Sequence, residues 1–276
     1  MAHLSLAARF SLGGRVILIT GGGRGIGMAL SKTCLDAGAT VVVTDILHQP
    51  DPVFLDWRKS TPNQLHYYCC DLTDKEEVER TFTSIVEKFH RIHGVVTAAG
   101  ICIDKPFLKH EWEDIQKLQA VNETGTFFAV QNAVKNMKQH GIKGSVVMIC
   151  SQSAQHVCPG HLLTAYAGSK GFVFSMARSL AHELAPDGIR VNTVSPGKEL
   201  PDALKTYRSD RSRYIATDMN LSLASLRPDA TLGRVGTPQD VELAALYLLS
   251  DASSYVTGQD IAIDGGMQVS SGNYKL

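Results

Sequence analysis

The chain has 276 residues, of which 44% are hydrophobic and 20% charged, and its 27 basic residues balance 27 acidic ones. These proportions are ordinary for a globular protein, and the length allows one large α/β domain or two small ones. Zero net charge gives no basic surface for nucleic acid or an anionic membrane, and no apolar run approaches the ~20 residues that span a bilayer. We therefore expect no nucleic-acid partner and no membrane partner. A cytoplasmic location is expected from the cysteines, which we expect to be reduced.

The first predicted strand, residues 16–19, is continuously apolar, as expected of a strand buried on both faces. It runs into a glycine-rich turn, residues 20–27, and then into a helix-like segment. In this arrangement the amides at the helix N-terminus point at a pyrophosphate, so the turn predicts a dinucleotide cradle. The binding residues expected in the cradle are Gly21, Gly23, Arg24, Gly25, Ile26 and Gly27.

The second predicted strand, residues 40–43, leads to Asp45, which lies 18 residues after Gly27. A carboxylate at this point would hydrogen-bond the 2′-hydroxyl of an adenosine ribose and repel a 2′-phosphate. The sequence therefore favours NAD as the cofactor. NADP stays open, because Arg24 places a base in the glycine turn that could hold a 2′-phosphate.

Three further predicted strands cover residues 65–70, 94–100 and 189–194. The first is closed by Asp71-Leu72 and the last is followed by Pro196-Gly197. The middle one ends in small residues, Ala99 and Gly100, which would let the backbone approach a ligand closely.

The fifth strand, residues 145–150, delivers Ser151 and Ser153 to its carboxyl end, where open parallel sheets bind their ligands. The helix that follows carries Tyr166 and Lys170, which share one face because they are four residues apart. A cation at about 4 Å would lower the pKa of a tyrosine by roughly three units, into the range where proton transfer is efficient. We therefore expect Lys170 to make Tyr166 acidic.

Helical segments separate the strands along the whole chain. Capping boxes are predicted at residues 73–76 and 237–240, the helical stretch 111–137 is interrupted at Asn122 and Gly125, and residues 261–263 form a last short strand. This alternation predicts one domain over residues 1–276, with an α/β fold. The fold is a single Rossmann-type, doubly wound parallel sheet of about seven strands, with helices on both faces.

Six cysteines, at positions 34, 69, 70, 102, 150 and 158, show no CxxC pair and no metal-ligand spacing. We expect them to be reduced and structural, and we expect no metal site. Cys69 and Cys70 are adjacent, but alternation along a strand points their side chains to opposite faces. A redox switch at this pair is the remaining alternative.

With these residues in hand, the chain resembles the short-chain dehydrogenase/reductase family over nearly all of its length. The resemblance rests on the glycine pattern of residues 20–27, the pair Pro196-Gly197, the stretches 257–259 and 264–266, and the spacing of 13 residues from Ser153 to Tyr166. It departs from the family where residues 97–100 read Thr-Ala-Ala-Gly instead of Asn-Asn-Ala-Gly.

The resemblance implies hydride transfer between a nicotinamide and a carbon that bears a hydroxyl or carbonyl. It implies that Tyr166 exchanges the proton, Ser153 orients the substrate oxygen, Lys170 lowers the tyrosine pKa and holds the nicotinamide ribose, and Asn122 supports a water that leads to the lysine. It also implies that Tyr166 and Lys170 touch the cofactor, and that Asp71, which sits where the family contacts adenine, does so together with Leu72, Ala99, Gly100, Pro196 and Gly197. The family also implies a homo-oligomer, either a dimer or a tetramer.

The family motif whose threonine binds the nicotinamide carboxamide lies at residues 214–219 here, which makes Thr217 the expected contact. Sixteen residues, 198–213, separate it from Gly197, and half of them are charged. The insert is either an extension of the substrate loop or the product of a retained intron or alternative isoform, and the sequence leaves both open.

These features predict an oxidoreductase that moves a hydride between NAD(P) and a small secondary alcohol or ketone. Gln155 and His161 are the expected substrate contacts, and their polarity favours a polyol or sugar. The alternative is a catalytically silent, cofactor-binding protein of the same fold, disabled by the insert.

Overall fold

The computed structural model describes residues 5–158, 160–197 and 230–269. The insert 198–213 and Thr217, singled out in the sequence, lie outside the described residues. The strands are β1 (Val16–Thr20), β2 (Thr40–Asp45), β3 (Leu65–Cys69), β4 (Gly94–Thr97), β5 (Ser145–Ile149), β6 (Arg190–Pro196) and β7 (Asp260–Ile263). The α-helices are α1 (Leu6–Phe10), α2 (Gly25–Asp36), α3 (Pro52–Ser60), α4 (Lys75–Phe89), α5 (Trp112–Leu118), α6 (Thr126–Gln139), α7 (Thr164–Leu184) and α9 (Pro238–Leu249).

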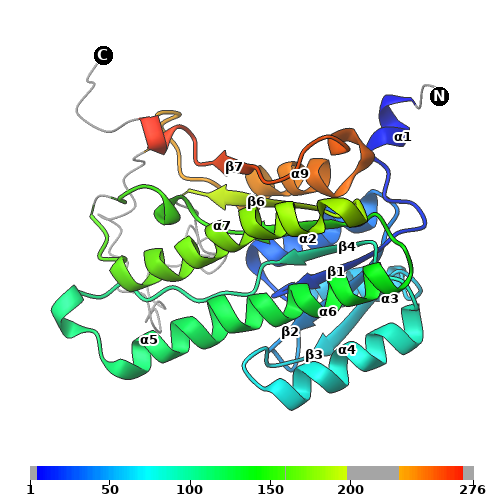
Figure 1. Cartoon of the computed structure of the whole chain (residues 1–276), viewed down its shortest axis with the longest axis horizontal. Coiled ribbons are helices and arrows are strands. Elements are labelled where there is room, and N and C mark those ends of the chain that lie inside the picture. The colour runs from blue at the N-terminus through cyan, green and yellow to red at the C-terminus, as the bar shows by residue number, and fades with distance from the viewer. Residues whose placement is uncertain (1–4, 159, 198–229, 270–276) are drawn as a thin grey trace.

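The strands form one parallel sheet in the order β3-β2-β1-β4-β5-β6-β7. Figure 1 shows α4, α6 and α7 side by side across one face, with α2 and α9 on the other. Two buried clusters match this layering, because one joins the sheet to α4, α6 and α7 and the other joins it to α2, α3 and α9. The predicted doubly wound fold of about seven strands is confirmed.

The order of the strands in the sheet switches sides between β1 and β4, which are parallel neighbours although β2 and β3 intervene in the sequence. Ligands of such sheets bind at this switch point, beyond the carboxyl ends of the strands. The glycine turn after β1 and the small residues after β4 therefore lie together at the place where the topology opens a crevice.

Local sequence explains how the helices begin. Thr237 and Asp240 form the predicted capping box of α9, with Pro238 in the first turn. At α4, however, Asp74 caps the helix through the Glu77 amide, and the Thr73 hydroxyl donates instead to Asp71. The capping residue is therefore one position later than the sequence pattern suggested.

The long helical stretch is interrupted where the sequence predicted it. Between α5 and α6 the chain forms a turn of π-helix, η2 (Gln119–Gly125), which contains the fully buried Asn122. Such π-turns displace a side chain from the regular helical face and occur frequently at functional sites. None of the helices in the described parts of the chain has the length and hydropathy needed to cross a bilayer.

Candidate active site

The glycine turn brings three backbone segments into close approach. Gly21 has φ +66°, and a Cβ built on it would lie 2.6 Å from Ala99, so any side chain here would collide with the strand end after β4. A Cβ on Gly27 would overlap the backbone of Gly21. Arg24 precedes α2 without making a side-chain capping bond, so the first amides of α2 are not satisfied by a side chain at that position. This surface is shaped to receive an anion such as a pyrophosphate.

Asp45 ends β2 directly beside this turn. It is 8% exposed, and its two carboxylate oxygens accept hydrogen bonds from Gly23 N–H at 2.8 Å and Leu47 N–H at 3.1 Å. The acid is thus fixed against the glycine turn, where the ribose of a dinucleotide would lie.

A cavity of about 350 Å³ lies between the glycine turn and the ends of β2, β3 and β4. Its lining includes most of the predicted cofactor residues: Gly21, Arg24, Gly25, Ile26, Gly27, Asp45, Asp71, Leu72, Ala99 and Gly100. Thr44 also lines it, and the buried Thr44 hydroxyl has no hydrogen-bond partner among the described residues. The close glycine approaches, the fixed acid and this unsatisfied hydroxyl all fit an adenine dinucleotide.

Several lining residues were not predicted from the sequence, among them Lys117 of α5 and Val121 of η2. Both belong to a helical stretch far along the chain from the glycine turn, and no motif marks them. Only the packing of this stretch against the segment after β4 places them in the cavity wall.

A second cavity, of about 200 Å³, shares Ile26, Ala98, Gly100 and Ile101 with the first and continues the cleft. Tyr166, Lys170, Ser151, Pro196 and Gly197 complete its lining, together with Ile149 and Cys150. The structure therefore brings the predicted tyrosine and lysine to the end of the dinucleotide cleft where a nicotinamide would lie.

Lys170 is buried, at 6% exposure, and donates to the Ile149 carbonyl at 2.9 Å. Its Nζ lies 5.9 Å from the centre of the Tyr166 ring. Burial lowers the pKa of Lys170, because removal from water disfavours the charged form. The ammonium is therefore close to the tyrosine but directed mainly at a backbone carbonyl.

The acidity that Lys170 is expected to give Tyr166 stays a prediction. In the structure, burial raises the pKa of the Tyr166 phenol above its usual value, the nearby Cys102 thiol raises it further, and the neighbouring Ser151 hydroxyl lowers it only in part. Desolvation disfavours the charged phenolate, so it acts against the attraction of a nearby ammonium. A phenol with a raised pKa keeps its proton and can donate it.

The serine beside Tyr166 is Ser151. Ser151 lines the second cavity together with Tyr166, whereas Ser153 is absent from the lining of that cavity. Ser153 receives a 3.2 Å bond from the Ser151 hydroxyl, and its Oγ lies 3.2 Å from Cys158 Sγ. The spacing of 13 residues selected Ser153, but the first turn beyond β5 places Ser151 at the cleft and Ser153 one contact behind it.

Asn122, in the π-turn, connects two segments that border the cleft. Its side chain bonds both the N–H and the C=O of Ile101, each at 2.9 Å, and donates to the Ser169 hydroxyl at 2.9 Å. Ser169 in turn donates to the Tyr166 carbonyl at 2.8 Å. Asn122 therefore joins the segment after β4 to the helix that carries the tyrosine.

Comparison with known proteins agrees with this geometry. A family model described as Enoyl-(Acyl carrier protein) reductase matches residues 21–268, which is most of the chain. The 3-oxoacyl-[acyl-carrier-protein] reductase of Thermotoga maritima is 35% identical over 259 residues, covering 94% of this chain and 99% of that protein. The chain belongs to the short-chain dehydrogenase/reductase family.

Other relatives show the chemistry of the family. The D-arabinitol 2-dehydrogenase [ribulose-forming] of Scheffersomyces stipitis is 30% identical and covers 97% of this chain and 98% of that protein. The crystal structure of a gluconate 5-dehydrogenase from Burkholderia cenocepacia, in complex with NADP and tartrate, has a TM-score of 0.83 at 27% identity, covering 96% and 99%. The protein is an NAD(P)-dependent short-chain dehydrogenase/reductase that interconverts a secondary alcohol and a ketone, and its substrate is a small molecule.

The two predicted substrate residues of this short-chain dehydrogenase/reductase are engaged in bonds within the protein. Gln155 is exposed and donates to Asp260 of β7 at 2.8 Å. His161 Nδ1 lies 2.7 Å from Asp104, whose other oxygen accepts the Leu162 amide at 2.9 Å. His161 thus fastens the segment after β4 to the segment before α7.

Proposed function

We propose that the protein interconverts a polyol, or a sugar-derived secondary alcohol, and its ketone, with NAD as the preferred cofactor. The observation that carries the proposal is that Tyr166, Ser151 and Lys170 line one cavity that continues the dinucleotide cleft. A relative that bears the name of a polyol dehydrogenase supports the substrate class.

The cofactor would be held along the cleft by this chain's own groups. The amides of the glycine turn would bind its pyrophosphate, Asp45 its adenosine ribose, Asp71 and Leu72 its adenine, and Pro196 with Gly197 its nicotinamide end. When bound, the nicotinamide accepts or supplies the hydride. Thr217 stays a predicted contact for its carboxamide.

Two hydroxyls would bind the substrate oxygen. The Ser151 hydroxyl, which donates to Ser153 in the structure, would turn to donate to this oxygen, orienting it and stabilising the negative charge that develops on it. Tyr166, whose pKa is raised by burial, would donate its proton to the same oxygen during ketone reduction, and the resulting phenolate would be reprotonated from solvent. Oxidation of the alcohol runs the same transfer in reverse.

Lys170 and Asn122 would support the Ser151 and Tyr166 hydroxyls without donating to the substrate oxygen themselves. The Lys170 ammonium, near the ring of Tyr166, stabilises the transient phenolate and is placed to contact the nicotinamide ribose. Asn122 holds the helix that carries Tyr166 in register with the segment after β4. Ser153, expected from spacing to be the catalytic serine, supports Ser151 through the bond between their hydroxyls.

We also propose the NAD preference on the position of Asp45, whose carboxylate is buried beside the glycine turn and would repel a 2′-phosphate. Arg24 is exposed and is the residue that a 2′-phosphate would pair with if NADP were used. We expect NADP to bind more weakly than NAD.

The assembly and the location of the protein are proposals too. Phe127 and Phe128 on α6 and Phe172 on α7 are each more than a third exposed, and such faces suit a dimer or tetramer that packs through α7 and through α9 with β7. All six cysteines are free, which suits the cytoplasm. We propose that residues 1–276 form one domain, with 198–213 as an extension of its substrate loop.

The test combines cofactor binding and turnover. NADH binding is followed by its fluorescence, and oxidation of a panel of polyols and reduction of the matching ketones are followed at the nicotinamide absorbance. We expect turnover on at least one polyol, lowered 10²- to 10⁴-fold in Tyr166→Phe while NADH binding is retained. Binding without turnover on any alcohol or ketone would refute the proposal and support a catalytically silent protein.

A further inference from the structure

The turn that follows Asp45 is held from the neighbouring strand β3. β2 and β3 are paired in register, with Val43 opposite Tyr67 and Asp45 opposite Cys69. Two side chains of β3 reach the carbonyls of the turn: Tyr67 Oη donates to Leu47 at 2.6 Å, and Cys69 Sγ lies 3.6 Å from the carbonyl of Ile46. The support comes from a strand with no motif for cofactor binding.

The Tyr67 hydroxyl reaches the glycine turn and the Asp45 carboxylate. A Cβ built on Gly23 would lie 3.3 Å from Tyr67 Oη and 2.9 Å from Asp45 Oδ2, so the phenol, the acid and the glycine turn meet at one point. The ring is held from below by the fully buried Phe54 of α3, with an edge contact at 5.6 Å between ring centres. Its position therefore does not depend on the hydroxyl alone.

Leu47 connects this phenol to the acid. Its N–H donates to Asp45 Oδ1 at 3.1 Å, and its C=O accepts from Tyr67 at 2.6 Å. With both backbone groups of Leu47 fixed, the Asp45 carboxylate is held between the Leu47 and Gly23 amides in a single orientation. Loss of the phenol hydroxyl frees one end of this chain of bonds and leaves the acid less firmly placed.

We propose that Tyr67 is a positioning residue that sets the preference for NAD over NADP by fixing the turn that orients Asp45. This role rests on the proposed NAD preference of the protein. A firmly placed carboxylate meets the ribose hydroxyls in good geometry and resists a 2′-phosphate, whereas one on a loosened turn does both less well.

The chemistry of Tyr67 suits a permanent donor. Burial raises its pKa, and the neighbouring charge of Asp45 raises it further, so the phenol keeps its proton throughout the working range. Tyr67 therefore donates to the Leu47 carbonyl and does not become a second negative charge beside Asp45.

The chain provides a matched control in Tyr68. It is the next residue of β3 and is half-buried like Tyr67, but it points to the other face of the sheet and packs against the cluster beneath α4, α6 and α7. Tyr67→Phe and Tyr68→Phe therefore each remove one phenol oxygen from β3, on opposite faces of the sheet.

The experiment measures dissociation constants for NADH and NADPH by fluorescence titration of the parent and both variants, alongside their melting temperatures. For Tyr67→Phe we expect the dissociation constant for NADH to rise about fivefold, with little change for NADPH. The ratio of the NADPH constant to the NADH constant should therefore fall about fivefold. Tyr68→Phe should keep the parent's ratio.

Three outcomes would overturn the role of Tyr67. The first is an unchanged ratio in Tyr67→Phe, and the second is an equal loss of both affinities with a lower melting temperature, which marks a structural residue. The third is an equal change of ratio in Tyr68→Phe. A parent protein that binds NADPH as tightly as NADH would refute the proposed NAD preference itself, and the Tyr67 role with it.

Discussion

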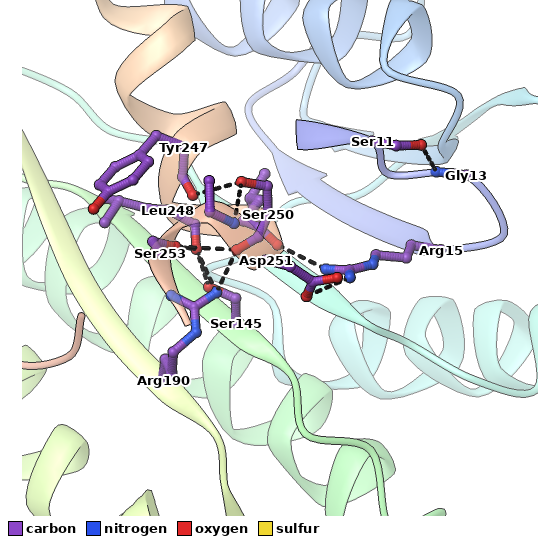
Figure 2. A network of polar contacts seen from close by, with 12 residues as sticks. Ser11, Gly13, Arg15, Ser145, Arg190, Tyr247, Leu248, Ser250, Asp251 and Ser253 are labelled. Atoms are coloured by element: carbon purple, nitrogen blue, oxygen red, sulfur yellow. Dashed lines mark hydrogen bonds and ion pairs between the residues drawn. The ribbon is translucent and has the colours of Figure 1, made fainter. Parts of the chain in front are cut away.

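The amino ends and the carboxyl ends of the strands differ in what their polar groups bind. Figure 2 shows the network at the amino ends, where Arg15 precedes β1, Ser145 begins β5 and Arg190 begins β6. The Leu248 carbonyl near the end of α9 accepts bonds from Arg190 at 2.8 Å, Ser145 at 2.7 Å and Ser253 at 3.0 Å. These side chains satisfy the last carbonyls of the helix, which have no partner within it.

Both arginines of this network donate to backbone carbonyls. Arg190 also donates to the Val256 and Ser250 carbonyls, at 3.3 and 3.2 Å. Arg15 donates to the Leu249 carbonyl at 3.1 Å and pairs with Asp251 at 2.6 Å. At this edge of the sheet the positive charges bind the protein's own backbone.

At the carboxyl ends the hydroxyls retain bonding capacity. The buried hydroxyls of Thr44 and Thr97, near the ends of β2 and β4, have no partner within the described ranges, and Thr44 lines the cavity of about 350 Å³. A polar group without a protein partner at the rim of a cavity is available to a ligand, whereas a fully bonded one stabilises the fold. We therefore call the carboxyl ends of the strands the reactive edge of the sheet and the amino ends its structural edge.

The largest effect that tests this comparison is expected from the two serines. Ser151→Ala removes the hydroxyl that faces the cleft and should lower kcat about 10²-fold, as loss of a donor to a developing oxyanion does. Ser153→Ala removes a group one contact away and should lower kcat less than tenfold. Rates for both variants at saturating NAD, with NADH affinity as the control, decide between them. A larger loss in Ser153→Ala would return the catalytic role to the serine that the spacing selected.

The structural edge is tested by Arg190→Met. It leaves buried carbonyls near the end of α9 without their donor, so we expect a loss of about 2 kcal/mol in the free energy of unfolding and a melting temperature lower by roughly 5 °C. Arg15→Met, whose charge pairs with the half-exposed Asp251, should lose less than about 1 kcal/mol.

Activity per folded molecule separates the two edges in the same variants. The rate constants of Arg190→Met should match the parent at a temperature where both are folded. A loss of turnover without a loss of stability would show that the amino edge also serves the reaction.

A smaller effect is expected at Asp240, which begins α9 at the reactive edge but is fully bonded. Arg234, together with the amide and hydroxyl of Thr237, holds the pKa of this carboxyl well below its usual value. Because the folded-state pKa is lowered, its contribution is present above about pH 4 and is lost as the pH falls through the folded-state value. Asp240→Asn should thus lose up to about 1 kcal/mol at pH 7, and this deficit should shrink in acid. Urea unfolding at pH 7 and pH 3 measures it.

The smallest expected effect concerns the ionisation of Tyr166. Burial raises the pKa of Tyr166, so without cofactor its phenol should stay protonated up to at least about pH 10. The ultraviolet titration of the protein should therefore superimpose on that of Tyr166→Phe below this pH. An extra tyrosinate near neutral pH in the parent would support the expectation that Lys170 acidifies the phenol.

The fold and most of the cofactor cleft follow from local patterns. Apolar runs predict the buried strands, and the glycine spacing predicts the turn, whose collisions at Gly21 and Gly27 show why no side chain is tolerated there. Asp45 was predictable because it ends a strand that must lie next to β1. The interruption at Asn122 was visible as well, although its bonds to Ile101 and Ser169 were not.

What local patterns could not supply depends on distances between segments far apart in the chain. Tyr67 acts on a turn 20 residues earlier, and Lys117 and Val121 reach the cleft from a helical stretch whose sequence contains no motif for cofactor binding. Gln155 and His161 are polar and near the cleft in sequence, yet their partners are Asp260 and Asp104.

The sequence by itself determined the order of strands and helices, the glycine cradle and the tyrosine–lysine pair, because each depends on side chains within a few residues of one another. Only the tertiary structure decided that Ser151 lines one cavity with Tyr166 and that the surroundings of this phenol raise its pKa. Both depend on how much water reaches a group and on what surrounds it, and those surroundings come from β4, β5, α7 and the loops between them, which are brought together only by folding.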